Sequence, residues 1–346
     1  MSVKNSEDAP RKSVGAIRHK AARISQENLV SIRLPVGGTP IPIIVEPVLD
    51  GVSLDYWAKD NSELIETLLR EHGALLFRNF EVMKIAQFES VISVICGELI
   101  DYTYRSTPRR RIDGKIFTST EYPADQQIPL HNEMAYARQW PMKVFFFCIK
   151  AAARGGETPL ADSRKVIQRI NRSLVEEFER KQLLYVRNYG TGLDLRWQEV
   201  FQTENKAEVE LYCQKSGIEV EWKDNDQLRT RQICQACATH PATGAKVWFN
   251  QAHLFHVSGL SPSVLNSLRG EFTDDELPRN VYFGDGSSIN DSMLEEIRSA
   301  YAQETVIFPW MPGDILLLDN MLTAHGRMPF EGLREVVVGM GQPFSG

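Results

Sequence analysis

The sequence predicts a mainly β protein with helical insertions (α+β), built on a jelly-roll core. From about residue 115 onward, short runs of β-branched and aromatic residues are separated by Gly, Pro and Asp, as is typical of a sandwich or barrel. Helical patterns interrupt these runs at residues 163–181, 262–272 and 293–302. Strands and helices do not alternate throughout, which a parallel α/β sheet would require, so the jelly roll is the better interpretation.

The strands predicted in this part of the chain are short apolar segments bounded by turn residues. They span residues 116–120, 144–149, 184–189, 245–250, 315–319 and 335–340. The first hundred residues have a different pattern, with strands at 41–46 and 74–78 and helices at 54–71 and 88–95. Gly73 follows the first helix as a stop signal.

Composition and charge limit the classes of function. The chain has 346 residues, 42% of them hydrophobic, which is enough for a large core. The net charge of -6 argues against nucleic acid as a partner, and no apolar run approaches the roughly 20 residues of a membrane span. The N-terminus has no apolar segment of a secretory signal, and five cysteines do not suggest a disulfide framework. We therefore expect a cytoplasmic enzyme, whose oligomeric state the sequence does not specify.

The chain divides into two parts of different composition. Residues 1–27 are polar and basic, and they predict a flexible arm. Residues 28–346 are expected to form a single domain, with the helical insertions at roughly 160–182 and 260–302.

The segment that carries the chemistry lies just before the apolar run at 144–149. It holds His131 and Glu133 two residues apart, a spacing that puts both side chains on one face of a strand. An imidazole and a carboxylate there would supply two-thirds of the His-His-carboxylate triad that holds non-heme Fe(II). His325, after the polar end of the strand at 315–319, could supply the third ligand. An H-x-E match recurs by chance, so its surroundings must support the hypothesis.

Arg334 opens the apolar strand that follows His325. A guanidinium on a buried strand needs a partner, and it binds a carboxylate through two parallel hydrogen bonds. Arg334 could thus receive the far carboxylate of a dicarboxylic acid, or it could form a structural ion pair. Arg327 is the nearer alternative.

Other residues offer competing interpretations. Cys234, Cys237 and His240 resemble half of a zinc site, but no second cysteine pair completes four ligands. His253 and His256 lie beside aromatic residues, which favours packing or the lining of a substrate pocket over metal binding.

The densest basic run consists of Arg109, Arg110 and Arg111. Such a run is usually a solvated loop. In a chain of net negative charge it could also concentrate an acidic substrate or partner locally.

The longer motifs around these residues resemble the taurine dioxygenase-like (TauD/TfdA) family of Fe(II)/2-oxoglutarate-dependent oxygenases. The chain is most similar to the branch of syringomycin-type amino-acid hydroxylases of nonribosomal-peptide biosynthesis. The similarity runs from about residue 73 to residue 340, in the segments 73–80, 119–123, 128–133, 155–162, 248–256, 310–320 and 324–330. It implies a double-stranded β-helix core of the cupin-like type.

Carried over by position, the resemblance implies that His131, Glu133 and His325 bind iron, and that Thr158 and Arg334 hold the far carboxylate of 2-oxoglutarate. Three protein ligands leave iron sites for 2-oxoglutarate and O2. The family carboxylate is more often aspartate, and the glutamate form occurs in the clavaminate synthase-like and amino-acid-hydroxylating branches. Related radical halogenases typically lack this carboxylate, so its presence favours hydroxylation or another oxygenase outcome.

The resemblance also places the loop before the metal-binding strand near the active site. The polar candidates for substrate binding there are Ser119, Thr120 and Glu121, beside Arg109, Arg110, Arg111 and Arg327. Some relatives in natural-product biosynthesis act on aminoacyl groups tethered to acidic carrier proteins. The arginine run, or else the basic arm, would then provide the docking surface.

The expected reaction is hydroxylation of an unactivated C–H bond of an amino-acid-like substrate, with release of succinate and CO2. The same iron chemistry serves epoxidation, desaturation and cyclisation, which the sequence does not separate. A jelly-roll binding protein without turnover and a zinc hydrolase are the rivals from other classes. The intact set of His131, Glu133, His325 and Arg334 argues against the first, and a hydrolase would not need Thr158 and Arg334.

Overall fold

The computed structural model describes residues 29–35, 40–100, 104–120 and 122–346. The predicted basic arm and Glu121 lie outside the described residues. No helix among those that are described is both long and apolar enough to cross a membrane.

The central element is an eight-stranded sheet, whose strands follow the order β1-β2-β3-β16-β7-β19-β5-β4. Their bounds are β1 Val30–Arg33, β2 Ile43–Pro47, β3 Ala74–Phe77, β4 Arg111–Asp113, β5 Ile116–Thr118, β7 Gln139–Lys150, β16 Ile315–Asp319 and β19 Glu335–Ser345. Both faces of the sheet's inner strands are buried, because apolar residues occupy consecutive positions there. In β7, for example, Phe145 and Phe147 pack with one core cluster while Val144 and Phe146 pack with the other.

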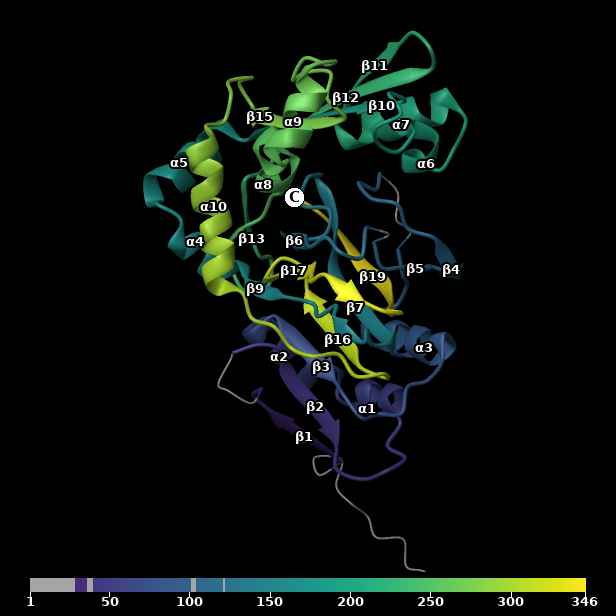
Figure 1. Cartoon of the computed structure of the whole chain (residues 1–346). Helices are drawn as coiled ribbons and strands as arrows, with labels where there is room; N and C mark the ends of the chain where they lie inside the picture. The colour runs from purple at the N-terminus through teal and green to yellow at the C-terminus, as the bar shows by residue number, and fades with distance from the viewer. Residues whose placement is uncertain (1–28, 36–39, 101–103, 121) are drawn as a thin grey trace, which may run out of the picture.

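Three helices cover the outer face of this sheet (Figure 1). They are α1 Leu54–Asp60, α2 Ser62–His72 and α3 Ile85–Cys96. The predicted helix at 54–71 is therefore two helices, because Asn61 leaves helical geometry and its side chain donates to the Trp57 carbonyl. The predicted stop is confirmed, since Gly73 ends α2 at a φ of 81 degrees.

Short strands cover the inner face and carry the candidate site. The three-stranded sheet β6-β17-β9 and the pair β18-β8 lie there. Their bounds are β6 Ile128–His131, β8 Arg154–Gly155, β9 Leu160–Asp162, β17 Thr323–Arg327 and β18 Phe330–Glu331. Leu160 and Leu322 from this layer pack in the same cluster as Phe146 and Leu316 of the main sheet. The predicted sandwich of sheets is thus confirmed.

The helix predicted at 163–181 is also interrupted by an asparagine. It forms α4 Ser163–Arg169 and α5 Arg172–Lys181, and Asn171 caps α5 by accepting from the Ser173 amide. These helices pack beside α10 Asp291–Glu304 along one side of the molecule (Figure 1).

A second sheet, β11-β12-β10-β15, lies above the core in Figure 1. Its strands are β10 Leu183–Tyr189, β11 Glu219–Lys223, β12 Gln227–Cys234 and β15 Arg279–Phe283. The remaining elements are α6 Trp197–Phe201, α7 Lys206–Ser216, β13 Cys237–Thr239, β14 Lys246–Trp248, α8 Ala252–Phe255, the 3-10 helix η2 Val257–Gly259 and α9 Pro262–Arg269. The segment 260–302 thus holds the strand β15 as well as two helices.

Candidate metal centre and substrate cavity

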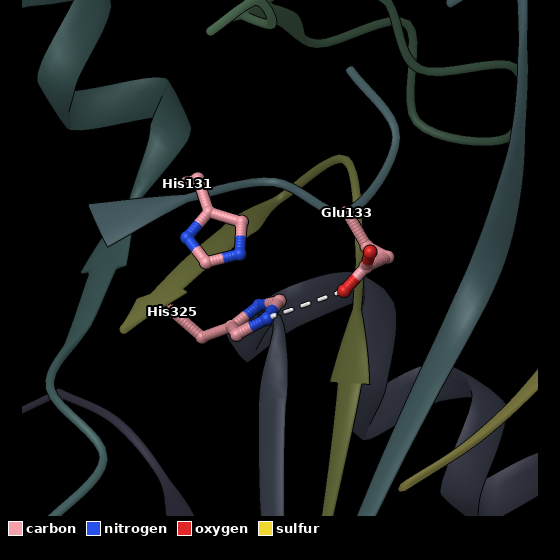
Figure 2. A group of neighbouring side chains, drawn as sticks. All are labelled: His131, Glu133 and His325. Carbon is pink, nitrogen blue, oxygen red and sulfur yellow. Dashed lines mark ion pairs between the residues drawn. The ribbon is translucent and has the colours of Figure 1, made fainter. Parts of the chain in front are cut away.

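His131, Glu133 and His325 converge between β6 and β17 (Figure 2). His325 lies directly opposite His131 in the antiparallel pairing of these strands. Glu133 is in the turn after β6, not on the strand itself, and the turn returns its carboxylate towards both imidazoles. One ligand atom from each residue lies within 4.8 Å of the others, and Glu133 Oε2 is 3.8 Å from His325 Nε2.

The two imidazoles are set up to donate lone pairs. His131 Nδ1 lies 2.8 Å from the Pro129 carbonyl. A carbonyl can only accept, so Nδ1 carries the proton and Nε2 is left to bind a metal. Burial lowers the pKa of both His131 and His325, which keeps the rings neutral at physiological pH. Two neutral nitrogens and one carboxylate oxygen on one side of a site fit non-heme Fe(II).

Asn320 holds the backbone of Glu133 in this position. Its Oδ1 accepts from the Glu133 amide at 2.7 Å, and its Nδ2 donates to the Glu133 carbonyl at 2.9 Å and to the Pro141 carbonyl at 2.8 Å. Asn320 is fully buried, immediately after β16. The candidate carboxylate ligand is therefore fixed through its main chain by a residue at the end of a main-sheet strand.

The rest of this turn is fixed by one other segment of the chain. Three side chains from 235–253 donate to carbonyls of β6 and the turn, namely His253 to Leu130 at 2.9 Å, Gln251 to Asn132 at 2.7 Å and Gln235 to Ala135 at 3.0 Å. A turn held at so many points cannot easily change the direction of the Glu133 carboxylate.

Arg109 pairs with the carboxylate itself. Its Nη2 donates to Glu133 Oε2 at 2.8 Å, and both side chains are only 3% exposed. Arg109 therefore does not share a surface with its two neighbours in the basic run. Arg110 and Arg111 are exposed, and the Arg111 guanidinium lies 5.5 Å from the centre of the Phe117 ring.

A narrow cavity of ≈ 30 Å³ leads from the two histidines to Arg334. Thr158 lines it and accepts a hydrogen bond from Trp310 Nε1 at 3.1 Å. Arg334 Nε donates to the Gly156 carbonyl at 2.8 Å, and Nη1 lies 3.5 Å from Ser119 Oγ. Burial, followed by the nearby Arg327 cation, lowers the pKa of Arg334 to about 10. Arg334 is still charged at neutral pH, in a place where an anion would offset its desolvation.

Arg327 also lines this cavity, but its guanidinium is already engaged. It donates to the carbonyls of Tyr122, Pro123 and Gln126 at 2.6–3.0 Å. Of Arg327 and Arg334, Arg334 thus has more donor capacity left for a ligand.

A wider cavity of ≈ 230 Å³ also borders His131. Thr120, Arg109 and His131 line both cavities, so the two cavities meet at His131. Of the predicted substrate residues, Ser119 lines only the narrow cavity, and Arg110 and Arg111 line neither.

Segment 251–260, which the sequence singled out only for packing or pocket lining, forms much of the wider cavity. Gln251, Leu254, Phe255, His256 and Leu260 line it. His256 thus fits that expectation, whereas the buried His253 supports the turn.

These supporting roles could not be predicted from the sequence, because one hydrogen bond to a distant carbonyl leaves no periodic pattern. The cysteines behave as expected of structural residues. Cys234 is buried and donates to the Tyr136 carbonyl at 3.3 Å, while His240 Nε2 lies 2.9 Å from Asp319 Oδ2. Within the described parts of the chain, the triad is the one cluster with metal-ligating geometry.

Comparison with known proteins gives the relationship. Residues 37–340 match the family model described as "Taurine catabolism dioxygenase TauD, TfdA family". The dapdiamide synthesis protein DdaC of Enterobacter agglomerans is 41% identical over 90% of this chain and 94% of its own length. A clavaminate synthase-like protein of Arabidopsis thaliana is 30% identical, over 88% of this chain and 91% of its own.

The fold is also that of a solved structure, PvcB of Pseudomonas aeruginosa. It superposes with a TM-score of 0.54 and 15% identity, covering 93% of this chain and 94% of that one. The family match spans most of the chain and includes the strands that bring the two histidines and the glutamate together. The chain therefore belongs to the TauD/TfdA family of Fe(II)- and 2-oxoglutarate-dependent dioxygenases.

Proposed function

We propose that this dioxygenase hydroxylates an unactivated C–H bond of an amino-acid-like substrate in a natural-product pathway. The observation that carries the proposal is the meeting of two unequal cavities at His131. The narrow one ends at Arg334 and suits a small dicarboxylate, while the wide one suits a larger substrate. The 41% identity to a protein of dapdiamide synthesis supports a biosynthetic role.

His131, Glu133 and His325 would hold the iron, and Thr158 and Arg334 would bind the far carboxylate of 2-oxoglutarate. When bound, iron and 2-oxoglutarate use O2 to oxidise the substrate, with release of succinate and CO2. Asn320 and the supports of the turn would keep the ligands in place, and the walls of the wide cavity would orient the C–H bond and exclude water.

The test is product analysis by mass spectrometry with Fe(II), 2-oxoglutarate and O2, using free and carrier-tethered amino acids. A gain of one oxygen supports hydroxylation, whereas a loss of two hydrogens would show desaturation or ring closure. An alkene substrate that gains one oxygen would show epoxidation. His131→Ala, Glu133→Ala and His325→Ala should each abolish succinate formation, and iron content should fall most for the histidines. Normal iron content and succinate formation in His325→Ala would refute the metal site.

A carrier-tethered substrate is the finer part of this proposal. Arg110 and Arg111 are exposed at the start of β4, where an acidic carrier could approach. Reversing both charges to Glu should slow oxidation of a tethered substrate at low salt. Equally fast oxidation of tethered substrate by the reversed protein would exclude docking at this surface.

A further inference from the structure

Arg279 is a cationic residue that lines the wide cavity from β15 of the upper sheet, together with Val257, Gly259 and Leu260. His131 and Glu133 line the same cavity from β6 and the turn that follows it. β15 belongs to the sheet above β6 and β17 (Figure 1). A substrate that fills the cavity would therefore extend from the metal ligands towards Arg279.

The contacts of Arg279 hold it in place but leave donors over. Its guanidinium carbon lies 5.5 Å from the centre of the Phe255 ring, which also lines the cavity. Its Nε is 3.5 Å from Asp194 Oδ2, and the side chain is 38% exposed. The two Nη groups make no hydrogen bond to the described part of the chain. They could together bind a carboxylate or phosphate.

A second arginine lies directly opposite Arg279. Arg187 is its partner in the antiparallel pairing of β10 and β15, and like charges in that arrangement repel. Arg187 is buried among the rings of Tyr104, Tyr136 and Tyr189, at 4.9–5.7 Å. Its Nη2 donates to the Arg105 carbonyl, and its buried Nη1 lacks a hydrogen-bond partner in the described residues.

This corner of the cavity is therefore deficient in negative charge. Among the described residues, these two arginines make one ion pair, which joins Arg279 to Asp194. An anion beside Arg279 would balance the second cation. Such an excess of fixed positive charge at a cavity end favours anionic ligands.

We infer that Arg279 binds an anionic oxygen group of the substrate, while the carbon to be oxidised lies at the metal. The inference rests on the proposed function and deepens it, because it names the charge and position of the substrate's far end. The group could be the carboxylate of a free amino-acid-like molecule or the phosphate of a pantetheine arm. Both present the same chemistry to a guanidinium.

The experiment measures binding by calorimetry to the Mn(II)-loaded protein with 2-oxoglutarate and without O2. Two pairs of probes each differ in one anionic group, namely 4′-phosphopantetheine with pantetheine, and N-acetyl-L-glutamate with N-acetyl-L-glutamine. The anionic member of one pair should bind the wild-type protein about tenfold more tightly, as expected for a partly exposed charged hydrogen bond. Arg279→Gln should remove the preference, and Arg279→Lys should restore part of it.

Arg269→Gln is the matched control. It removes the same charge from α9, where Arg269 pairs with Asp274 and does not line the cavity. This variant should keep the full preference, so a preference lost in both variants would contradict the inference.

The pair of probes that shows the preference identifies the source of the anion. A preference for 4′-phosphopantetheine supports a tethered substrate, and one for N-acetyl-L-glutamate supports a free acid. No preference in the wild-type protein, or an undiminished one in Arg279→Gln, would overturn the inference. Equal weakening of both members of a pair would also contradict it, because charge recognition changes only their ratio. Succinate formation that depends on His325 tests the proposed function separately.

Discussion

Replacing Asn320 with Ala would show how strongly the main chain of Glu133 determines metal binding. The change removes three buried hydrogen bonds, at 2.7–2.9 Å, to the amide and carbonyl of Glu133 and to the carbonyl of Pro141. It leaves all three proposed ligand side chains in place. Any loss of metal affinity would then come from their position and not from their chemistry.

The expected energy follows from these three contacts. A buried backbone group that loses its partner costs about 1–3 kcal/mol, and water entering the small gap would recover part of that. Three such groups give a loss of about 3–5 kcal/mol in the free energy of unfolding, a large part of the typical total of about 5–15 kcal/mol. The dissociation constant for Mn(II) should rise about 10- to 100-fold, as for other residues that orient metal ligands.

The assay combines urea unfolding of the metal-free protein with Mn(II) titration, and Asn188→Ala is its control. Asn188 is also buried, and it makes three comparable hydrogen bonds in the upper sheet, to the carbonyls of Asp275 and Leu277 and to Arg229. The control should lose similar stability and keep the affinity for Mn(II). If Asn320→Ala also kept that affinity, the main chain of Glu133 would not control the site.

Three further predictions concern other residues of the site. Arg334→Met should raise the KM for 2-oxoglutarate well over tenfold in steady-state kinetics, because a buried carboxylate loses a bidentate partner. Arg334→Lys should recover part of the affinity. A larger defect in Arg327→Met would show that Arg327, and not Arg334, binds that carboxylate. Burial lowers the pKa of His253 to about 4, so the unfolded chain takes up a proton first as the pH falls and stability is lost between pH 6.5 and 4. His253→Asn should show a smaller loss over this range in urea unfolding, and equal loss would contradict the pKa. Arg109→Met should destabilise the metal-free protein more than the Mn(II)-loaded one in urea unfolding, because bound Mn(II) would replace Arg109 as the cation beside Glu133. Equal destabilisation of the two forms would show that the metal does not take over this role.

The elements that the sequence predicted correctly are those whose signal is local. Consecutive apolar residues at 144–149 and 315–319 predicted strands, and both strands lie in the main sheet, where they are largely buried. The two-residue spacing of His131 and Glu133 predicted that they would lie together. They do so through a turn, however, which periodicity cannot distinguish from a strand end.

The elements that the sequence did not predict depend on distant partners. Gln227–Cys234 forms β12 although it carries two arginines, and Arg229 is buried because Asn188 and Asp275 bind it. The helix breaks at Asn61 and Asn171 could not be predicted, because the apolar helical spacing continues on both sides of each asparagine. The burial of Arg109 could not be predicted, since a run of like charges does not show which of its side chains points into the protein.

The segment at 250–257 supports the backbone beside His131 and Glu133 and also lines the wide cavity, and this limits how the enzyme can be redesigned. Gln251 and His253 hold carbonyls of the metal-binding turn, while Leu254 and Phe255, on the same short helix or beside it, line the wide cavity. Enlarging the cavity at these two positions would shift the backbone that orients the turn. The same substitution would therefore change the substrate range and weaken metal binding. Leu260 and Arg279 are among the residues that line the cavity outside this segment, and a library at these two positions could vary specificity without disturbing the turn.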